Sequence, residues 1–261
     1  MTQTSITDED QYLKFCLLAS QNENVFNNFK QNTVYRQVLE HVSEQQGLDF
    51  YNEFRNNKKL VDSLDQFTMN DQLGFAQIVN YEFKKISAST LRYVKILNDL
   101  LEFEIENANI IEIGGGYGGQ CTIIKKYLDI SSYSIVDLKE PLALTKKYLT
   151  KLNLNENVNF IDGKDTSNEF LNSYHLVISN YAISECSRVV QDYYIENILS
   201  KSKQGYIIYN QIFEYFKNWS SEKVGYNHEK FAEKLKSCNK NVQIEKEVPL
   251  TSSNNVLITW K

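Results

Sequence analysis

The sequence predicts an α/β fold, and two observations indicate this class. After residue 110, short runs rich in β-branched and aromatic residues alternate with helical runs, which is typical of a parallel sheet with helices between its strands. The first 105 residues instead show helical periodicity and no strand pattern above background. We therefore expect a sheet domain over residues 86–261, preceded by a helical cap over residues 1–85.

Seven strands are expected in the sheet domain. They cover residues 110–113, 133–137, 158–161, 176–179, 206–209, 242–248 and 256–260. The last two are joined by PLTSSNN, which is shorter than the dozen or so residues that a parallel crossover needs. We therefore expect five parallel strands followed by an antiparallel hairpin. This is the sheet of class I methyltransferases, whereas a dinucleotide-binding fold consists of two parallel halves.

Helices are expected both in the cap and between the strands. In TVYRQVLEHV, residues Val34, Val38 and Val42 share one helical face, and STLRYVKILNDLL shows the same period. QCTIIKKYL and PLALTKKYL predict helices after the first and second strands of the sheet. QDYYIENILSKSKQG predicts a further helix that ends at Gly205.

Composition excludes several function classes. The formal charge is −5, so no broad basic surface is available for a nucleic acid. The four cysteines form no C-x-x-C pair, which argues against a zinc ribbon or a disulfide framework. The acidic N-terminal stretch is unlike a signal peptide, and no run approaches the roughly 20 apolar residues of a membrane span. We expect a cytoplasmic protein with a small-molecule or glycan partner; the composition leaves homo-oligomerisation open.

A glycine-rich loop is the strongest local signal. IIEIGGGYGGQC holds five of the ten glycines between Gly114 and Gly119, a density that suits a sharp turn or a close approach to a ligand. The loop precedes a helix, so its N–H groups and the helix dipole would face a negatively charged group. The spacing fits G-x-G-x-x-G, where that group is a pyrophosphate, and E-x-G-x-G-x-G, where it is the carboxylate of S-adenosylmethionine. Spacing alone leaves both open.

Three acids lie within a predicted strand or at its end. Glu112 stands inside the first strand, where a charge needs a partner, and methyltransferases commonly carry an acid there. Asp137 ends the second strand, at the position that binds ribose hydroxyls in both cofactor classes. Asp162 follows the third strand and fits two interpretations equally, an adenine contact or a plain turn.

The segment after the fourth strand is expected to face the reactive end of the cofactor. Asn180, Tyr181 and Glu185 lie there, at the edge where open α/β sheets bind ligands. Transfer of a methyl group to an alcohol requires a base, and Glu185 and His228 are the candidates. No role is predicted for His41.

Five segments together resemble the sugar O-methyltransferase family over residues 35–211. They are ISASTLRYVKILNDL, NIIEIGGGYGGQC, YSIVDLKEPLALTKKYL, LVISNYAISEC and VVQDYYIENILSKSKQGYIIYNQI. The resemblance implies a class I fold, S-adenosylmethionine as cofactor and a sugar hydroxyl as acceptor. The expected cofactor contacts are Glu112, Gly114, Gly115, Gly116, Tyr117, Gly118, Gly119, Gln120, Asp137, Leu138, Asp162, Asn180, Thr90 and Arg92. The chain departs from the family pattern at Ala88, where a proline is expected, and at His175, where an aspartate is.

Other functions stay open beside this one. They are methyl transfer to oxygen or nitrogen of a non-sugar molecule, nicotinamide-dependent redox chemistry, and a non-catalytic binding subunit. Asp162, Asp165 and Glu185 could gather around Mg²⁺, but they form no compact ligand motif, so no metal is expected.

Overall fold

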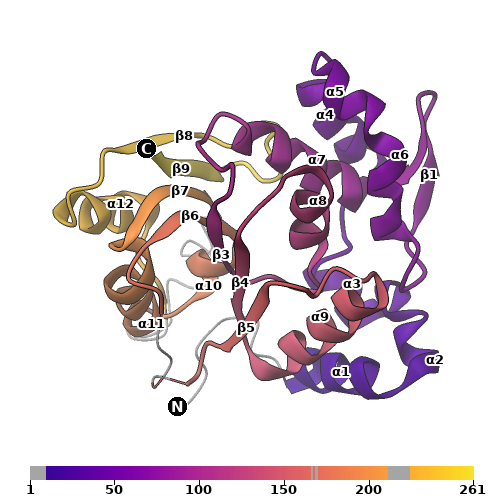
Figure 1. Ribbon diagram of the computed structural model, residues 1–261, viewed down its shortest axis with the longest axis horizontal. Helices are drawn as coiled ribbons and strands as arrows, with labels where there is room; N and C mark the ends of the chain where they lie inside the picture. Colours follow the sequence, from indigo (N-terminus) through magenta and orange to yellow (C-terminus); the bar gives the residue numbers. More distant parts are fainter. Residues whose placement is uncertain (1–9, 166, 168–169, 211–223) are drawn as a thin grey trace.

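The computed structural model describes residues 10–165, 167, 170–210 and 224–261 (Figure 1). A seven-stranded sheet forms its centre, with strand order β5-β4-β3-β6-β7-β9-β8. These strands are β3 (Asn109–Ile113), β4 (Ser132–Asp137), β5 (Val158–Asp162), β6 (Tyr174–Asn180), β7 (Ser202–Tyr209), β8 (Val242–Lys246) and β9 (Val256–Trp260). Each of the seven predicted strands is present, with ends that differ by a few residues.

Strand directions confirm the predicted fold class. The pairs β5-β4, β4-β3, β3-β6 and β6-β7 are parallel, whereas β9 runs antiparallel to both β7 and β8. From β3 the chain adds β4 and β5 on one side and then crosses to β6 on the other. The order therefore reverses beside β3, and open α/β sheets bind ligands at such a switch point, outside the carboxyl ends of the strands.

Helices cover both faces of the sheet (Figure 1). They are α1 (Asp10–Gln21), α2 (Glu23–Phe26), α3 (Thr33–Val38), α4 (Glu44–Phe54), α5 (Lys58–Asp62), α6 (Leu64–Phe67), α7 (Ala88–Leu100), α8 (Gly119–Tyr127), α9 (Lys139–Lys151), α10 (Ala182–Glu185), α11 (Arg188–Tyr194) and α12 (His228–Ser237). Short 3-10 turns occur at η1 (Phe29–Gln31) and η2 (Thr68–Asp71), and α11 continues as one π-helical segment, η3 (Ile195–Leu199). No described helix is long and apolar enough to span a bilayer.

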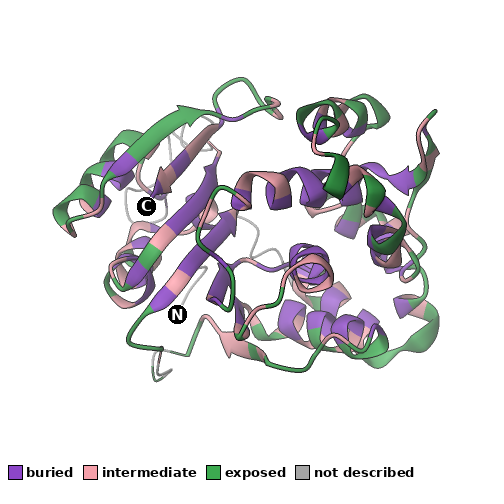
Figure 2. Cartoon of the chain, turned by 45° about the horizontal axis from the view of Figure 1, so that its top comes forward, coloured by how far each residue is buried: buried purple, intermediate pink, exposed green. Residues whose placement is uncertain are grey.

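Two hydrophobic cores follow from the alternation of side chains along the strands. Ile110 faces a core that also contains Phe26, Tyr35 and Leu97, so the N-terminal helices and α7 share one apolar interior with the sheet. Ile111 faces the opposite core, which α11, η3 and α12 cover. Figure 2 shows buried residues concentrated along the central strands and exposed residues on the outer faces of the helices and on β8.

The N-terminal region contains a hairpin that its sequence did not predict. Strands β1 (Ile78–Asn80) and β2 (Lys85–Ser87) pair antiparallel. Each has three residues, too few for a period-two pattern to rise above background. Helix α3 ends at Val38, so the predicted continuation of its apolar face to Val42 is wrong.

Gly205 was predicted to end a helix, and this prediction is wrong. It lies inside β7 and pairs with Trp260 of β9. A Cβ atom there would lie 2.2 Å from Cη2 of the indole, so the glycine makes room for a buried ring. A single glycine after a helical pattern reads as a helix end, and only the sheet pairing distinguishes the two roles.

Candidate active site

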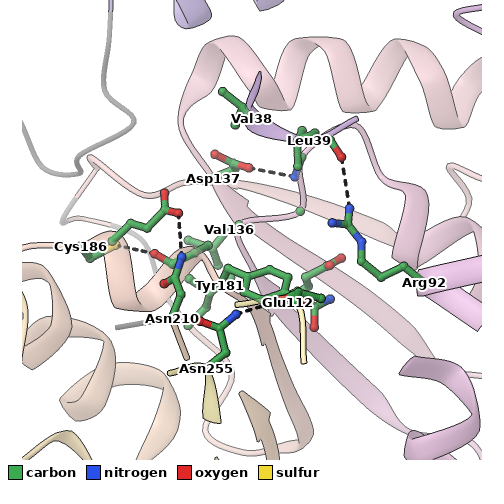
Figure 3. Close-up of a pocket in the computed structure, with 18 of the residues that line it drawn as sticks. Val38, Leu39, Arg92, Glu112, Val136, Asp137, Tyr181, Cys186, Asn210 and Asn255 are labelled. Atoms are coloured by element: carbon green, nitrogen blue, oxygen red, sulfur yellow. Dashed lines mark hydrogen bonds between the residues drawn. The ribbon is translucent and has the colours of Figure 1, made fainter. Parts of the chain in front are cut away.

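A cavity of about 480 Å³ opens at the carboxyl ends of all five parallel strands. Residues at or just after the ends of these strands line it, from β3, β4, β5, β6 and β7. Further walls come from α1, from residues 38–50, from α7 and from residues 251–255. In Figure 3, Arg92 and Glu112 lie on one side and Cys186 and Asn210 on the other, with Tyr181 between them.

The first half of the glycine loop forms part of this cavity. Gly114, Gly115 and Gly116 line it, and Gly114 and Gly116 have φ of 80° and 56°. A Cβ atom on Gly114 would lie 2.0 Å from that of Ala182, so the turn has no room for a side chain. Gly118 has the left-handed conformation at the N-cap of α8. It faces α9 and not the cavity.

Glu112 is a buried acid in the cavity wall. Its side chain is 2% exposed, and Tyr133 Oη donates a 2.8 Å hydrogen bond to Oε2. Burial raises its pKa to about 8, the charge of Asp137 adds to the rise, and the tyrosine hydrogen bond opposes it. The carboxyl group is therefore mostly protonated at pH 7, and a cation placed beside it would favour its ionised form.

Asp137 and Asp162 end adjacent strands but differ in orientation. Asp137 lines the cavity, and its carboxylate accepts hydrogen bonds from the backbone N–H groups of Gly116 at 3.2 Å and Leu138 at 2.8 Å. Asp162 accepts from the N–H of Lys164 at 3.0 Å, while the neighbouring Gly163 lines the cavity. The geometry of Asp162 is that of the plain turn.

Arg92 brings a positive charge from α7 into the cavity. It is 6% exposed, and Nη2 donates to the carbonyl of Leu39 at 3.3 Å and to Tyr93 Oη at 3.4 Å. Both hydrogen-bond partners are neutral, and the nearby charge of Glu40 helps to keep the guanidinium protonated without a direct hydrogen bond to it. A buried cation of this kind favours an anionic ligand.

Several expected cofactor contacts lie behind the cavity instead of lining it. Tyr117 is 1% exposed and accepts a hydrogen bond from Asn70 Nδ2. Gln120 Nε2 donates to the carbonyl of Tyr93, and the hydroxyl of Thr90 donates to a carboxylate of η2. Gly119 abuts the ring of Tyr93. These residues tie the glycine loop and α7 to the N-terminal helices, and so support the cavity from outside.

The segment after β6 supplies polar groups to the other half of the cavity. Asn180 Oδ1 is buried and has no hydrogen-bond partner in the part of the chain that the structure describes. Tyr181 has φ of 69°, a strained conformation for a non-glycine residue, and its hydroxyl donates to Glu247. Glu185 accepts a 3.4 Å hydrogen bond from Asn210 Nδ2. Asn180, Tyr181 and Glu185 all line the cavity, as the sequence predicted.

The histidines are placed differently from the sequence-based expectation. His228 begins α12, which packs against β8 and η3, and it is not among the residues that line the cavity. His41, which had no predicted role, lies in the cavity wall between α3 and α4. His41 is solvent-exposed, yet protein atoms on its inner side desolvate the imidazole and lower its pKa, and the charge of Arg92 lowers the pKa further. It is therefore neutral at pH 7 and can accept a proton.

Sequence reasoning also missed the loop between β8 and β9. Thr251, Ser252, Ser253, Asn254 and Asn255 all line the cavity. The run of hydroxyl and amide side chains in PLTSSNN was a signal, but it fits a hairpin turn equally well. Within the described residues, no three His, Cys, Asp or Glu side chains gather as a metal site.

The sheet order and the place of the cavity together define the fold. It is that of a class I methyltransferase. Over 148 residues the chain is 30% identical to the release factor glutamine methyltransferase of Fusobacterium nucleatum. This match covers 51% of the chain and 41% of the relative, so the chain spans less than half the length of that relative. No family model matches the chain.

Solved structures with related architecture are more distant in sequence. One is an O-methyltransferase family protein from Burkholderia thailandensis, at 13% identity and a TM-score of 0.48, covering 64% of this chain and 55% of that one. Another is a SAM-dependent methyltransferase from Aquifex aeolicus, at 15% identity and a TM-score of 0.47, covering 64% and 88%.

Proposed function

We propose that this protein is an S-adenosylmethionine-dependent methyltransferase. The observation that carries the proposal is the convergence of Glu112, Arg92, Asp137 and the turn Gly114–Gly116 on one cavity. Sequence similarity to a methyltransferase over half of the chain agrees with it.

The lining groups complement the parts of the cofactor in turn. Ionised Glu112 would pair with the methionine ammonium, and Arg92 with the methionine carboxylate. Asp137, whose carboxylate is oriented by two backbone N–H groups, would accept hydrogen bonds from the ribose hydroxyls. Gly163 and Leu138 line the adjoining wall, where the adenine would lie. The glycine turn lets the backbone pass close beneath the methionine end.

The proposed acceptor is a sugar hydroxyl. When bound, S-adenosylmethionine would supply an electrophilic methyl group, with its carbon–sulfur bond breaking as the carbon–oxygen bond forms and the electron pair remaining on sulfur. Asn180 Oδ1, buried and without a hydrogen-bond partner among the described residues, would accept a hydrogen bond from a neighbouring hydroxyl of the sugar and so orient the acceptor. Glu185 would take the hydroxyl proton, and His41 is a second candidate for this step. The resemblance to sugar O-methyltransferases supports this acceptor class.

A second candidate acceptor is a side-chain amide nitrogen. The relative from Fusobacterium nucleatum is a glutamine methyltransferase, and the unpaired Asn180 Oδ1 would accept equally well from an amide N–H. An amide nitrogen is a poor nucleophile because its lone pair is delocalised into the carbonyl group, so this reaction too would transfer an N–H proton to a base such as Glu185.

Calorimetry tests the methyltransferase assignment, and a methyl-transfer assay tests the acceptor. S-adenosylhomocysteine should bind and NADH should not; the reverse result would refute the methyltransferase assignment. Radiolabelled S-adenosylmethionine should then methylate members of a panel of glycosides in preference to a glutamine-containing peptide. Methylation of the peptide alone would show that the acceptor is an amide nitrogen and not a sugar hydroxyl.

A further inference from the structure

Glu247 connects the sheet to the loop that follows β8. This side chain is 3% exposed and accepts hydrogen bonds from four donors. They are the Tyr181 hydroxyl, the N–H of Thr251 at 3.1 Å, Thr251 Oγ1 at 2.7 Å and Asn255 Nδ2 at 2.9 Å. An ionised carboxylate is an acceptor only, so four donors satisfy both of its oxygens.

These hydrogen bonds fix the loop in one conformation. Asn255 Nδ2 also donates to Thr251 Oγ1 at 2.9 Å, and the backbone N–H of Glu247 donates to the carbonyl of Asn255. The two ends of the loop are thus joined through side chains and backbone. Ser252, Ser253 and Asn254 lie exposed between them and contribute little packing of their own. Without Glu247, ordering this loop would cost conformational entropy that no apolar burial offsets.

The loop presents only neutral polar side chains to the cavity. Thr251–Asn255 line it together with Tyr181, and Asn210 adds an amide beside Glu185. Hydroxyl and amide groups both donate and accept, which suits a ligand with several hydroxyls. Glu185 adds a carboxylate beside this loop, which disfavours an anionic group in the acceptor, and the guanidinium of Arg92 would already be paired with the methionine carboxylate.

We propose that loop 251–255 recognises the acceptor, that Glu247 is its positioning residue, and that the acceptor is an uncharged, hydroxyl-rich molecule. This inference rests on the proposed function and narrows its acceptor class to uncharged molecules. A nucleotide-linked sugar carries two phosphate charges and therefore falls outside that class. Tyr181 transmits the position of the loop to the end of β6, where Asn180 would orient the acceptor through a hydroxyl next to the reacting one.

The central variant is Glu247→Gln, with Glu245→Gln as its matched control. The first substitution would place an amide N–H₂ against groups that are themselves donors, whereas Glu245 lies exposed on β8, two residues earlier in the chain. Loss of a hydrogen bond to a charged group corresponds to about tenfold or more. Binding of S-adenosylhomocysteine, measured by calorimetry, should stay within twofold of the wild-type value in both variants. This also shows that each variant is folded.

The acceptor arm uses a panel of methyl glycosides and a matched panel of UDP- and dTDP-linked sugars. We expect methyl transfer to a neutral glycoside, with KM raised about tenfold in Glu247→Gln and unchanged in Glu245→Gln. Hydrogen exchange of the backbone amides of Val248 and of residues 250–255 should be faster in Glu247→Gln alone, a readout that needs no acceptor.

Each other outcome has a defined meaning. Unchanged KM or unchanged exchange in Glu247→Gln overturns the positioning role. Preferred methylation of a nucleotide-linked sugar, or no transfer to any glycoside by a protein that binds S-adenosylhomocysteine, overturns the acceptor class and leaves the methyltransferase proposal in place. Failure to bind S-adenosylhomocysteine refutes the proposed function itself.

Discussion

Proton release from Glu112 should accompany cofactor binding. With its pKa at about 8, roughly one in ten of these carboxyls is ionised at pH 7 and one in a hundred at pH 6. An ammonium group bound beside it requires the ionised form, so binding near neutral pH releases a proton. The dissociation constant of S-adenosylhomocysteine should therefore fall about 50-fold from pH 6 to pH 8. The improvement should stop near pH 8, where the ligand's own α-amino group begins to lose its proton.

Calorimetry at pH 6, 7 and 8 measures this directly. Nearly one proton should be released for each ligand bound at pH 7. The apparent binding enthalpies measured in two buffers should therefore differ by nearly the difference between the ionisation enthalpies of those buffers. Glu112→Gln should abolish both the buffer dependence and the slope with pH, and should weaken binding at pH 8 by about 10- to 100-fold. A dissociation constant equal at pH 6 and pH 8, with no buffer dependence, would refute the reasoning.

The stability of the ligand-free protein provides an independent check on Glu112. Its folded-state pKa is raised above the ordinary value of 4.5, so between pH 4.5 and about 8 the folded state binds more protons than the unfolded state. This contribution makes the free energy of unfolding fall as pH rises through that window, and the fall ends above pH 8. Urea unfolding of wild type and Glu112→Gln should therefore diverge with rising pH, the variant becoming relatively more stable.

Four further substitutions, one of them with a matched control, test the site and the sheet. Arg92→Gln should weaken S-adenosylhomocysteine binding by about 10- to 100-fold, whereas Arg36→Gln, at an exposed position, should not; equal effects would remove Arg92 from the cofactor site. Glu185→Gln should lower kcat by about 10²- to 10⁴-fold at unchanged cofactor affinity. If His41→Gln has that effect instead, the histidine is the base, and if neither does, both assignments of the base are wrong. Gly205→Ala should lower the free energy of unfolding by about 1–3 kcal/mol, because the new methyl group would overlap a buried indole; a urea midpoint equal to wild type would contradict this.

Local sequence was enough to predict the sheet. The central strands contain short runs of β-branched and aromatic residues, and the brief link PLTSSNN required the last two strands to be antiparallel. The same reasoning located Glu112 and Asp137, because the carboxyl ends of parallel strands meet at one edge whatever surrounds them.

Tertiary packing decided which neighbouring residues reach the cavity. Tyr117 stands within the glycine loop, yet aromatic side chains of the N-terminal helices draw it into the core. Asp162 ends its strand as Asp137 does, but its own turn supplies a hydrogen-bond donor and holds the carboxylate there.

The sequence by itself determined the α/β class, the strand directions and the acids at the strand ends, since these depend on periodicity and on connection length. Only the tertiary structure brought His41 and loop 251–255 to the cavity while placing His228 elsewhere. Irregular segments have no period from which their position can be inferred. They lie where packing and hydrogen bonds such as those of Glu247 hold them, and those partners are distant in the chain.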